Sequence, residues 1–108
     1  MLHIGIDEYV FDVLMPDLVG HDHSPSAFLV YLFLWAGLYR SEQKRVAASL
    51  HQIAEGTGLS KSAVQTGMRI LKRRRLVVVS KHSSTATPEY ELVRHWIRRR
   101  AKLQHASS

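Results

Sequence analysis

The segment spanning residues 61–74 carries side chains whose types and spacing suit contact with a polyanion. Its apolar positions recur at i, i+3, i+4 and i+7, which predicts a helix with one buried face. Those positions are Val64, Gly67, Met68 and Leu71. The opposite face offers amide, hydroxyl and cationic groups, namely Lys61, Ser62, Gln65, Thr66 and Arg69. Hydrogen-bonding groups beside fixed positive charge form a surface that suits a phosphate-rich partner.

An unbroken basic run ends this segment and consists of Lys72, Arg73, Arg74 and Arg75. Cations in the last turn of a helix also offset the helix dipole without any ligand. Four consecutive side chains cannot all face one surface, because a helix turns the chain through about 100° per residue. We therefore expect only part of the run, Lys72 and Arg73, to touch phosphate.

The charge of the chain is divided unevenly along its length. Five acids and no Lys or Arg precede Ser24, whereas the remainder holds 15 basic residues and 4 acids, a net charge of 15 − 4 = +11. An acidic segment, residues 1–23, thus precedes a basic body. Such a body suits nucleic acid or an anionic membrane surface, and a solvated basic surface that only maintains solubility is the alternative.

Composition narrows the class of protein further. A chain of 108 residues that is 45% hydrophobic fits one folded domain. The absence of cysteine excludes disulfides and thiolate metal sites. The most apolar stretch, residues 27–39, is shorter than the roughly 18 residues of a membrane span. No basic segment opens the chain as in a secretory signal, so a cytoplasmic protein without a membrane partner is expected.

The first helix is predicted from Ser24 onward. Ser24 suits the N-cap and Pro25 the first helical position, so a helix is expected over residues 25–40. Its apolar side chains surround the axis, so more than one side must be covered. We expect residues 1–23 to cover part of it and leave open a second copy of the protein, that is, a homodimer. Within residues 1–23, residues 9–14 fit a strand or a helical turn, and Pro16 favours a turn or a short helix.

The remaining elements are short. A strand is expected at residues 45–48, and a second helix from Ser49 or Leu50 to Glu55 or Gly56. Gly56 and Gly58 are expected in the next turn, where one of them can take the left-handed conformation that ends a helix. Ser60 is expected to cap the third helix, residues 61–74. Residues 76–81 and 89–93 read as two strands of a hairpin whose turn is residues 82–88. Residues 94–108 are expected to form a basic helix or tail.

The segment LHQIAEGTGLSKSAVQTGMRILKRRRLV, residues 50–77, resembles the helix-turn-helix of bacterial winged-helix DNA-binding proteins. Ala54 is small where the two helices would cross, and Gly58 lies four residues later in the turn. Leu59 and Val64 are apolar and suited to pack the pair together. The hairpin, residues 76–93, lies where that family has its wing. The resemblance covers residues 24–93 and departs from the family pattern at Gly67, which predicts close packing against a neighbouring helix.

The resemblance implies a mainly α fold with a small β-hairpin wing (α+β) around a three-helix core. It also implies a double-stranded DNA partner, with residues 61–74 as the recognition helix in the major groove. Gln65 and Ser62 are then the expected base contacts, Thr66 and Arg69 lie near the backbone, and Lys61 fits either role. At the wing, phosphate or minor-groove contacts are expected from Lys81, His82 and Ser83, although a solvated hairpin tip explains these residues equally. The tail residues Arg98, Arg99, Arg100 and Lys102 add phosphate contacts or only keep the C-terminus soluble.

The function that follows is sequence-specific DNA binding as a small bacterial transcription regulator. The alternatives are the DNA-binding domain of a phage or plasmid replication initiator, and a winged-helix protein-interaction module. Charge and motif do not separate the first two. A docking role would use the apolar first helix and the acidic segment as its surface.

Other chemistries find less support in the sequence. The cluster His21, Asp22 and His23 suits zinc or nickel but lacks further ligands at a metal-site spacing, so no metal or cofactor is expected. No nucleophile elbow, glycine-rich phosphate loop or carboxylate pair is present, so no enzyme is expected. Phe28, Phe33 and Trp35 are better explained as core residues than as the lining of a small-molecule pocket, and Trp96 is expected to cover the edge of the core.

Overall fold

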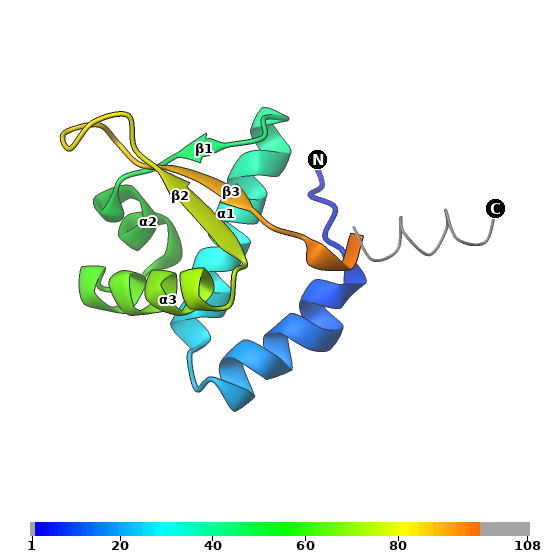
Figure 1. Ribbon diagram of the computed structural model, residues 1–108. Helices are drawn as coiled ribbons and strands as arrows, with labels where there is room; N and C mark the ends of the chain where they lie inside the picture. Colours follow the sequence, from blue (N-terminus) through cyan, green and yellow to red (C-terminus); the bar gives the residue numbers. More distant parts are fainter. Residues whose placement is uncertain (1, 98–108) are drawn as a thin grey trace.

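Helices dominate the fold, with a small antiparallel sheet on one side of them (Figure 1). The structure is a computed structural model and describes residues 2–97. Its α-helices are α1 (Pro25–Ser41), α2 (Leu50–Thr57) and α3 (Lys61–Arg73), and its strands are β1 (Val46–Ala47), β2 (Val77–Ser80) and β3 (Glu89–Leu92). This confirms a mainly helical α+β fold.

Side-chain caps define where the α-helices begin. Ser24 Oγ accepts a hydrogen bond from the Ala27 N–H at 3.3 Å, and Ser60 Oγ accepts one from the Ala63 N–H at 3.1 Å. Both caps confirm the sequence prediction. At α2, Ser49 and Gln52 form a reciprocal capping box, which satisfies two backbone donors at once.

The N-terminal segment is helical, so of the two alternatives left open for residues 9–14 the helical turn is confirmed and the strand is wrong. Two stretches with i→i+5 hydrogen bonds, η1 (Val10–Leu14) and η2 (Pro16–His21), follow one another with Met15 between them. Because such a helix is wider than an α-helix, residues four apart stay on one face. Val10, Leu14 and Leu18 have this spacing and are at most 2% exposed. Burial of this face favours one continuous helix, and Pro16 lies in the first turn of the short element η2, which confirms the short helix that Pro16 predicted.

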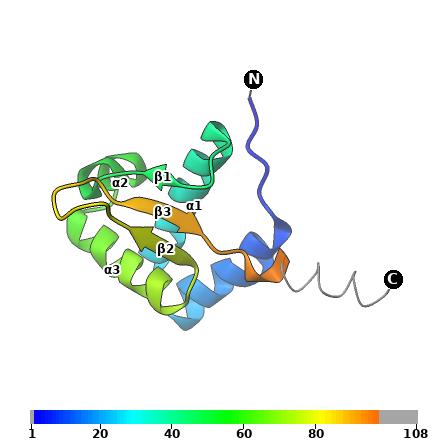
Figure 2. The same ribbon diagram turned by 45° about the horizontal axis from the view of Figure 1, so that its top comes forward.

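Helix α1 lies at the centre of the molecule. It packs against α3, α2, the N-terminal helix and the sheet, so most of its apolar surface is covered within one chain (Figure 2). Val30, Tyr31 and Leu34 have no exposed surface. The side that sequence analysis left open for a second copy is therefore occupied in large part by residues 10–21.

Gly67 permits a close backbone contact between α1 and α3. A Cβ at this position would lie 2.9 Å from the Ala27 nitrogen and 3.0 Å from the Ser26 carbonyl carbon and oxygen. Helix α3 therefore crosses the first turn of α1 with its backbone against the backbone of α1. This confirms the close packing that Gly67 predicts.

Gly67→Ala is expected to destabilise the protein by about 1–3 kcal/mol, because the added methyl group must push two backbones apart. Helix propensity alone favours alanine over glycine by about 1 kcal/mol, so a loss of stability in Gly67→Ala would have to come from the helix contact. Gly20→Ala is the matched control, because nothing lies within 4 Å of its added Cβ. Urea unfolding should show a stabilised or unchanged Gly20→Ala protein, and an equally stable Gly67→Ala protein would contradict the crossing.

The sheet has the order β1-β3-β2, with both pairs antiparallel. Tyr90 pairs with Val46 on one side and Val79 on the other, and its side chain is 6% exposed. Strands β2 and β3 form the expected hairpin with a loop of residues 81–88. Strand β2 ends at Ser80, so Lys81 belongs to the loop and not to the strand as predicted.

Tyr31 carries a buried hydroxyl that has no hydrogen-bond partner among the described residues. Burial raises the pKa of this phenol far above its usual value, an effect that the nearby Asp7 increases and Arg94 reduces. The neutral form is therefore kept in the folded protein at pH values where an exposed tyrosine ionises.

Stability is expected to fall as the pH rises above about 10, because Tyr31 then ionises in the unfolded chain and not in the folded one. The loss from this group approaches about 1.4 kcal/mol per pH unit. Tyr31→Phe should reduce this alkaline sensitivity and leave stability near neutral pH unchanged or slightly higher, since the hydroxyl has no partner. Tyr39→Phe, at an exposed position, is the control. Urea unfolding of both variants is measured from pH 8 to 11. The same pH dependence in both would refute the role of Tyr31 in the alkaline loss of stability.

Candidate nucleic-acid interface

A tight turn between α2 and α3 fixes the geometry of the candidate interface. Gly58 ends α2 with φ 79°, a left-handed conformation that favours glycine. The Thr57 hydroxyl donates to the Ile53 carbonyl at 2.7 Å and accepts from the Leu59 N–H at 3.2 Å. This bridge was not anticipated from sequence, although a Thr in the last turn of a helix is a common way to satisfy the turn. The direction of α3 relative to α2 is thus set by backbone and side-chain bonds together.

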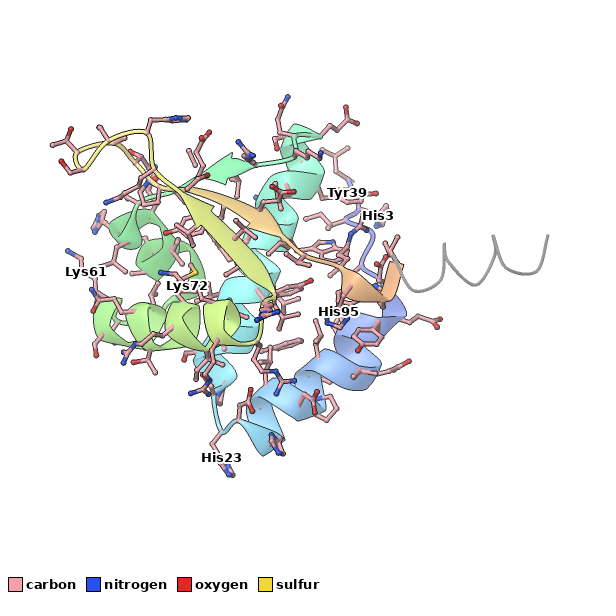
Figure 3. The ribbon with its side chains drawn as sticks, in the orientation of Figure 1. His3, His23, Tyr39, Lys61, Lys72 and His95 are labelled. Atoms are coloured by element: carbon pink, nitrogen blue, oxygen red, sulfur yellow. The ribbon has the colours of Figure 1, made fainter. Side chains whose placement is uncertain are left out.

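One face of α3 is buried and the other is open to solvent. The buried residues are the four predicted ones, Val64, Gly67, Met68 and Leu71. The exposed residues include all seven predicted site residues of this helix, Lys61, Ser62, Gln65, Thr66, Arg69, Lys72 and Arg73. Figure 3 shows Lys61 at the N-terminal end of α3 and Lys72 farther along it. The structure therefore brings these seven residues together on one helix.

The charged residues on the exposed face of α3 are all positive. Four of its residues are cations and the helix contains no carboxylate. Arg69 Nη2 donates to Thr66 Oγ1 at 3.3 Å, which holds the guanidinium beside the hydroxyl. Both groups can then reach one phosphate, while Ser62 and Gln65 lie nearer the start of the helix.

Arg74 differs from the other cations of the basic run at residues 72–75, because its guanidinium forms ion pairs within the protein. Its Nη1 lies 3.1 and 3.2 Å from the two Asp22 carboxylate oxygens, and its Nη2 lies 2.8 Å from Asp17 Oδ2. The Asp22 side chain is only 8% exposed. Arg74 thus joins the end of α3 to the N-terminal helix, whereas Arg73 and Arg75 are exposed. This role of Arg74 was not predictable from the sequence, because its partners lie 57 and 52 residues earlier in the chain.

Arg74→Gln is expected to lower the free energy of unfolding by about 1–3 kcal/mol, because it leaves the nearly buried Asp22 carboxylate without its charged partner. Arg73→Gln removes the same charge from an exposed site and should change stability by less than about 0.5 kcal/mol. Urea denaturation of the two variants makes the comparison. Equal stability losses would show that the ion pairs of Arg74 contribute nothing specific.

The hairpin loop extends on the same side of the molecule as the N-terminal end of α3 (Figures 1 and 2). Lys81, His82 and Ser83 are exposed in this loop, as expected. His82 is restrained, however, because its Nε2 lies 2.9 Å from Glu89 Oε1 at the base of β3. Of the three, Lys81 offers a positive charge that no carboxylate of the described chain holds.

The histidine cluster before α1 does not assemble a metal centre within the described residues. His21 Nδ1 contacts Asp22 Oδ1 at 3.0 Å, but Arg74 already engages both oxygens of that carboxylate. His23 is exposed, with φ 51°, at the start of α1 (Figure 3). Residues 2–97 contain no group of three His, Cys, Asp or Glu side chains placed to hold an ion.

Contacts at the other end of the chain involve the N-terminal segment. Trp96 Nε1 donates to Asp7 Oδ2 at 2.9 Å, and its ring stacks on Tyr9 with centroids 4.4 Å apart. Trp96 packs against the edge of the core in this way. The tail residues Arg98, Arg99, Arg100 and Lys102 lie outside the described residues, as does most of the helix or tail expected at residues 94–108.

None of the helices within residues 2–97 is both long and apolar enough to cross a membrane. Comparisons with protein-family models, with curated proteins and with solved structures find no match to this chain.

Proposed function

We propose that this protein binds double-stranded DNA as a winged helix-turn-helix domain, with α3 entering the major groove. The observation that carries the proposal is the exposed face of α3, which combines an amide, hydroxyls and four cations with no carboxylate. The turn at Gly58 and the crossing at Gly67 hold this face outward. A helix held in this way is the reading element of helix-turn-helix domains.

Each exposed residue has a role that fits its chemistry and position. Gln65 can pair with an adenine edge, and Ser62, one turn earlier, can accept or donate to either base type. Arg69 and Thr66 bind one phosphate together, since their side chains are already hydrogen-bonded. Lys72 and Arg73 neutralise phosphates farther along, and Lys61 contacts base or phosphate at the start of the helix.

The loop of residues 81–88 acts as the wing. Lys81 and Ser83 contact phosphate or the minor groove beside α3, whereas Glu89 holds His82 back from the tip. The hairpin β2–β3 supports the loop, and β1 extends the sheet behind it. In this arrangement, charge on the wing adds affinity and α3 supplies specificity.

The proposed role is that of a small bacterial transcription regulator in the cytoplasm. A homodimer belongs to this proposal, because two copies of α3 would bind half-sites about one helical turn apart. The surface available for pairing is a row of exposed apolar residues on the N-terminal helix: Phe11, Met15 and Val19.

Selection of bound fragments from a random duplex library tests the proposal directly. A recurrent sequence would establish specificity, and a pseudo-palindrome would indicate a dimer. The genomic positions of such sequences distinguish a regulator, which binds near promoters, from a replication initiator, which binds at an origin.

On the selected duplex, Gln65→Ala should lower affinity by about 1–3 kcal/mol and leave binding to unrelated duplex unchanged. Arg69→Glu should weaken binding to every duplex and reduce the salt slope by about 1 or more. Arg40→Glu is the matched control, since Arg40 is exposed in the last turn of α1, far along that helix from the crossing with α3. Fluorescence anisotropy at several salt concentrations makes the measurement, and equal affinity of the two glutamate variants would refute the interface.

A further inference from the structure

A hollow of about 450 Å³ lies on the side of the molecule that bears Tyr39, away from Lys61 (Figure 3). It lies between the C-terminal end of α1, the loop before β1, and the end of β3. Its volume falls within the range of small-molecule sites, which is roughly 300–1,000 Å³. The residues that line it are Trp35, Leu38, Tyr39, Gln43, Lys44, Glu91, Leu92, Val93, Arg94 and Ile97.

An aromatic wall of this hollow is fixed in place. The Trp35 indole is 7% exposed, and its Nε1 donates to the Gly5 carbonyl at 2.8 Å. The Arg94 guanidinium lies 5.5 Å from the centroid of the Trp35 ring. Of the three aromatic residues that sequence analysis weighed as pocket residues, only Trp35 lines the hollow, because Phe28 is buried in the core and Phe33 packs under Gly56. The Arg94 guanidinium thus covers part of the Trp35 ring, and only a small part of this aromatic wall faces the hollow.

The charges around the hollow do not cancel. Glu91 lies 3.5 Å from Arg45, and Arg94 lies 3.5 Å from Asp7, so each of these lining charges has a counter-ion. Lys44 has no ion-pair partner within residues 2–97. The uncompensated charge at the hollow is thus positive.

We infer that the hollow binds a small carboxylate with an aromatic or branched apolar body. The body packs against Leu38, Leu92 and the small exposed part of Trp35, and the carboxylate binds between Lys44 and Arg94. A carboxylate that contacts Lys44, which is unpaired among the described residues, and Arg94, which also binds Asp7, gains more binding free energy than a neutral group of the same shape.

This site does not depend on DNA binding and does not overlap the proposed interface. The hollow lies at the end of α1 that is remote from its crossing with α3. One of its walls is the end of β3, which pairs with β2 and carries the loop of residues 81–88. A bound ligand would therefore contact the strand that supports the proposed wing without competing for α3.

Titration of the full chain with naphthoate, followed by two-dimensional amide NMR, tests the inference. Saturable shifts are expected for the Trp35 indole N–H and for the amides of Leu92 to Arg94, with a Kd of about 1 mM or lower. Uncharged naphthamide, which has the same shape, should bind about threefold to tenfold more weakly. Lys44→Gln should remove most of that difference by weakening naphthoate alone.

Arg40→Gln is the matched control, because Arg40 lies at the same end of α1 and does not line the hollow. Gln43→Trp, a change at an exposed position in the lining, should fill the hollow and abolish binding of both compounds while the remaining amide spectrum stays folded. The inference would be overturned by an absence of saturable shifts up to about 5 mM. It would also be overturned by shifts confined to α3, or by equal effects of Lys44→Gln and Arg40→Gln.

Discussion

The backbone contact between α1 and α3 at Gly67 is the constraint on which the other elements depend. Because no side chain separates the two helices at this point, their distance and crossing position are determined by the main chain of Ser26 and Ala27. One face of α3 is then committed to the core, and the polar residues spaced between the buried ones must face solvent. Helix α2 packs against both α1 and α3, and the turn at Gly58 joins it to α3. The candidate interface is thus a consequence of how one glycine packs.

Specific hydrogen bonds and ion pairs join the acidic N-terminal segment to the basic body, in addition to the buried apolar face of its helix. Arg74 binds Asp17 and Asp22, Trp96 binds Asp7, and Trp35 binds the backbone of Gly5. The first of these contacts removes one cation from the end of α3. The count of cations in the basic run therefore overstates the positive charge that the end of α3 presents to a partner. The number of cations without an ion pair is the better measure of that charge.

The parts of the fold that are encoded locally were predictable from sequence. Ser24 and Ser60 act as caps because their role depends on residues only three positions away, and the spacing from Val64 to Leu71 defines the buried face of α3. For residues 9–14 the sequence left a strand and a helical turn open, and the burial of Val10, Leu14 and Leu18 on one face decides for the helix. The partners of Arg74 and the lining of the hollow by Trp35 escaped prediction. Both require segments far apart in the chain to meet, and sequence spacing holds no information about such meetings.

The placement of the two tryptophans gives the protein an intrinsic optical property. These are the only tryptophans in the chain, and both donate their indole N–H groups to residues 5 and 7. Helices α2 and α3 contain none. Tryptophan emission therefore responds to the attachment of the N-terminal segment and to changes at the hollow that Trp35 lines, so release of that segment would be seen as a spectral change even while the basic helix stayed in place.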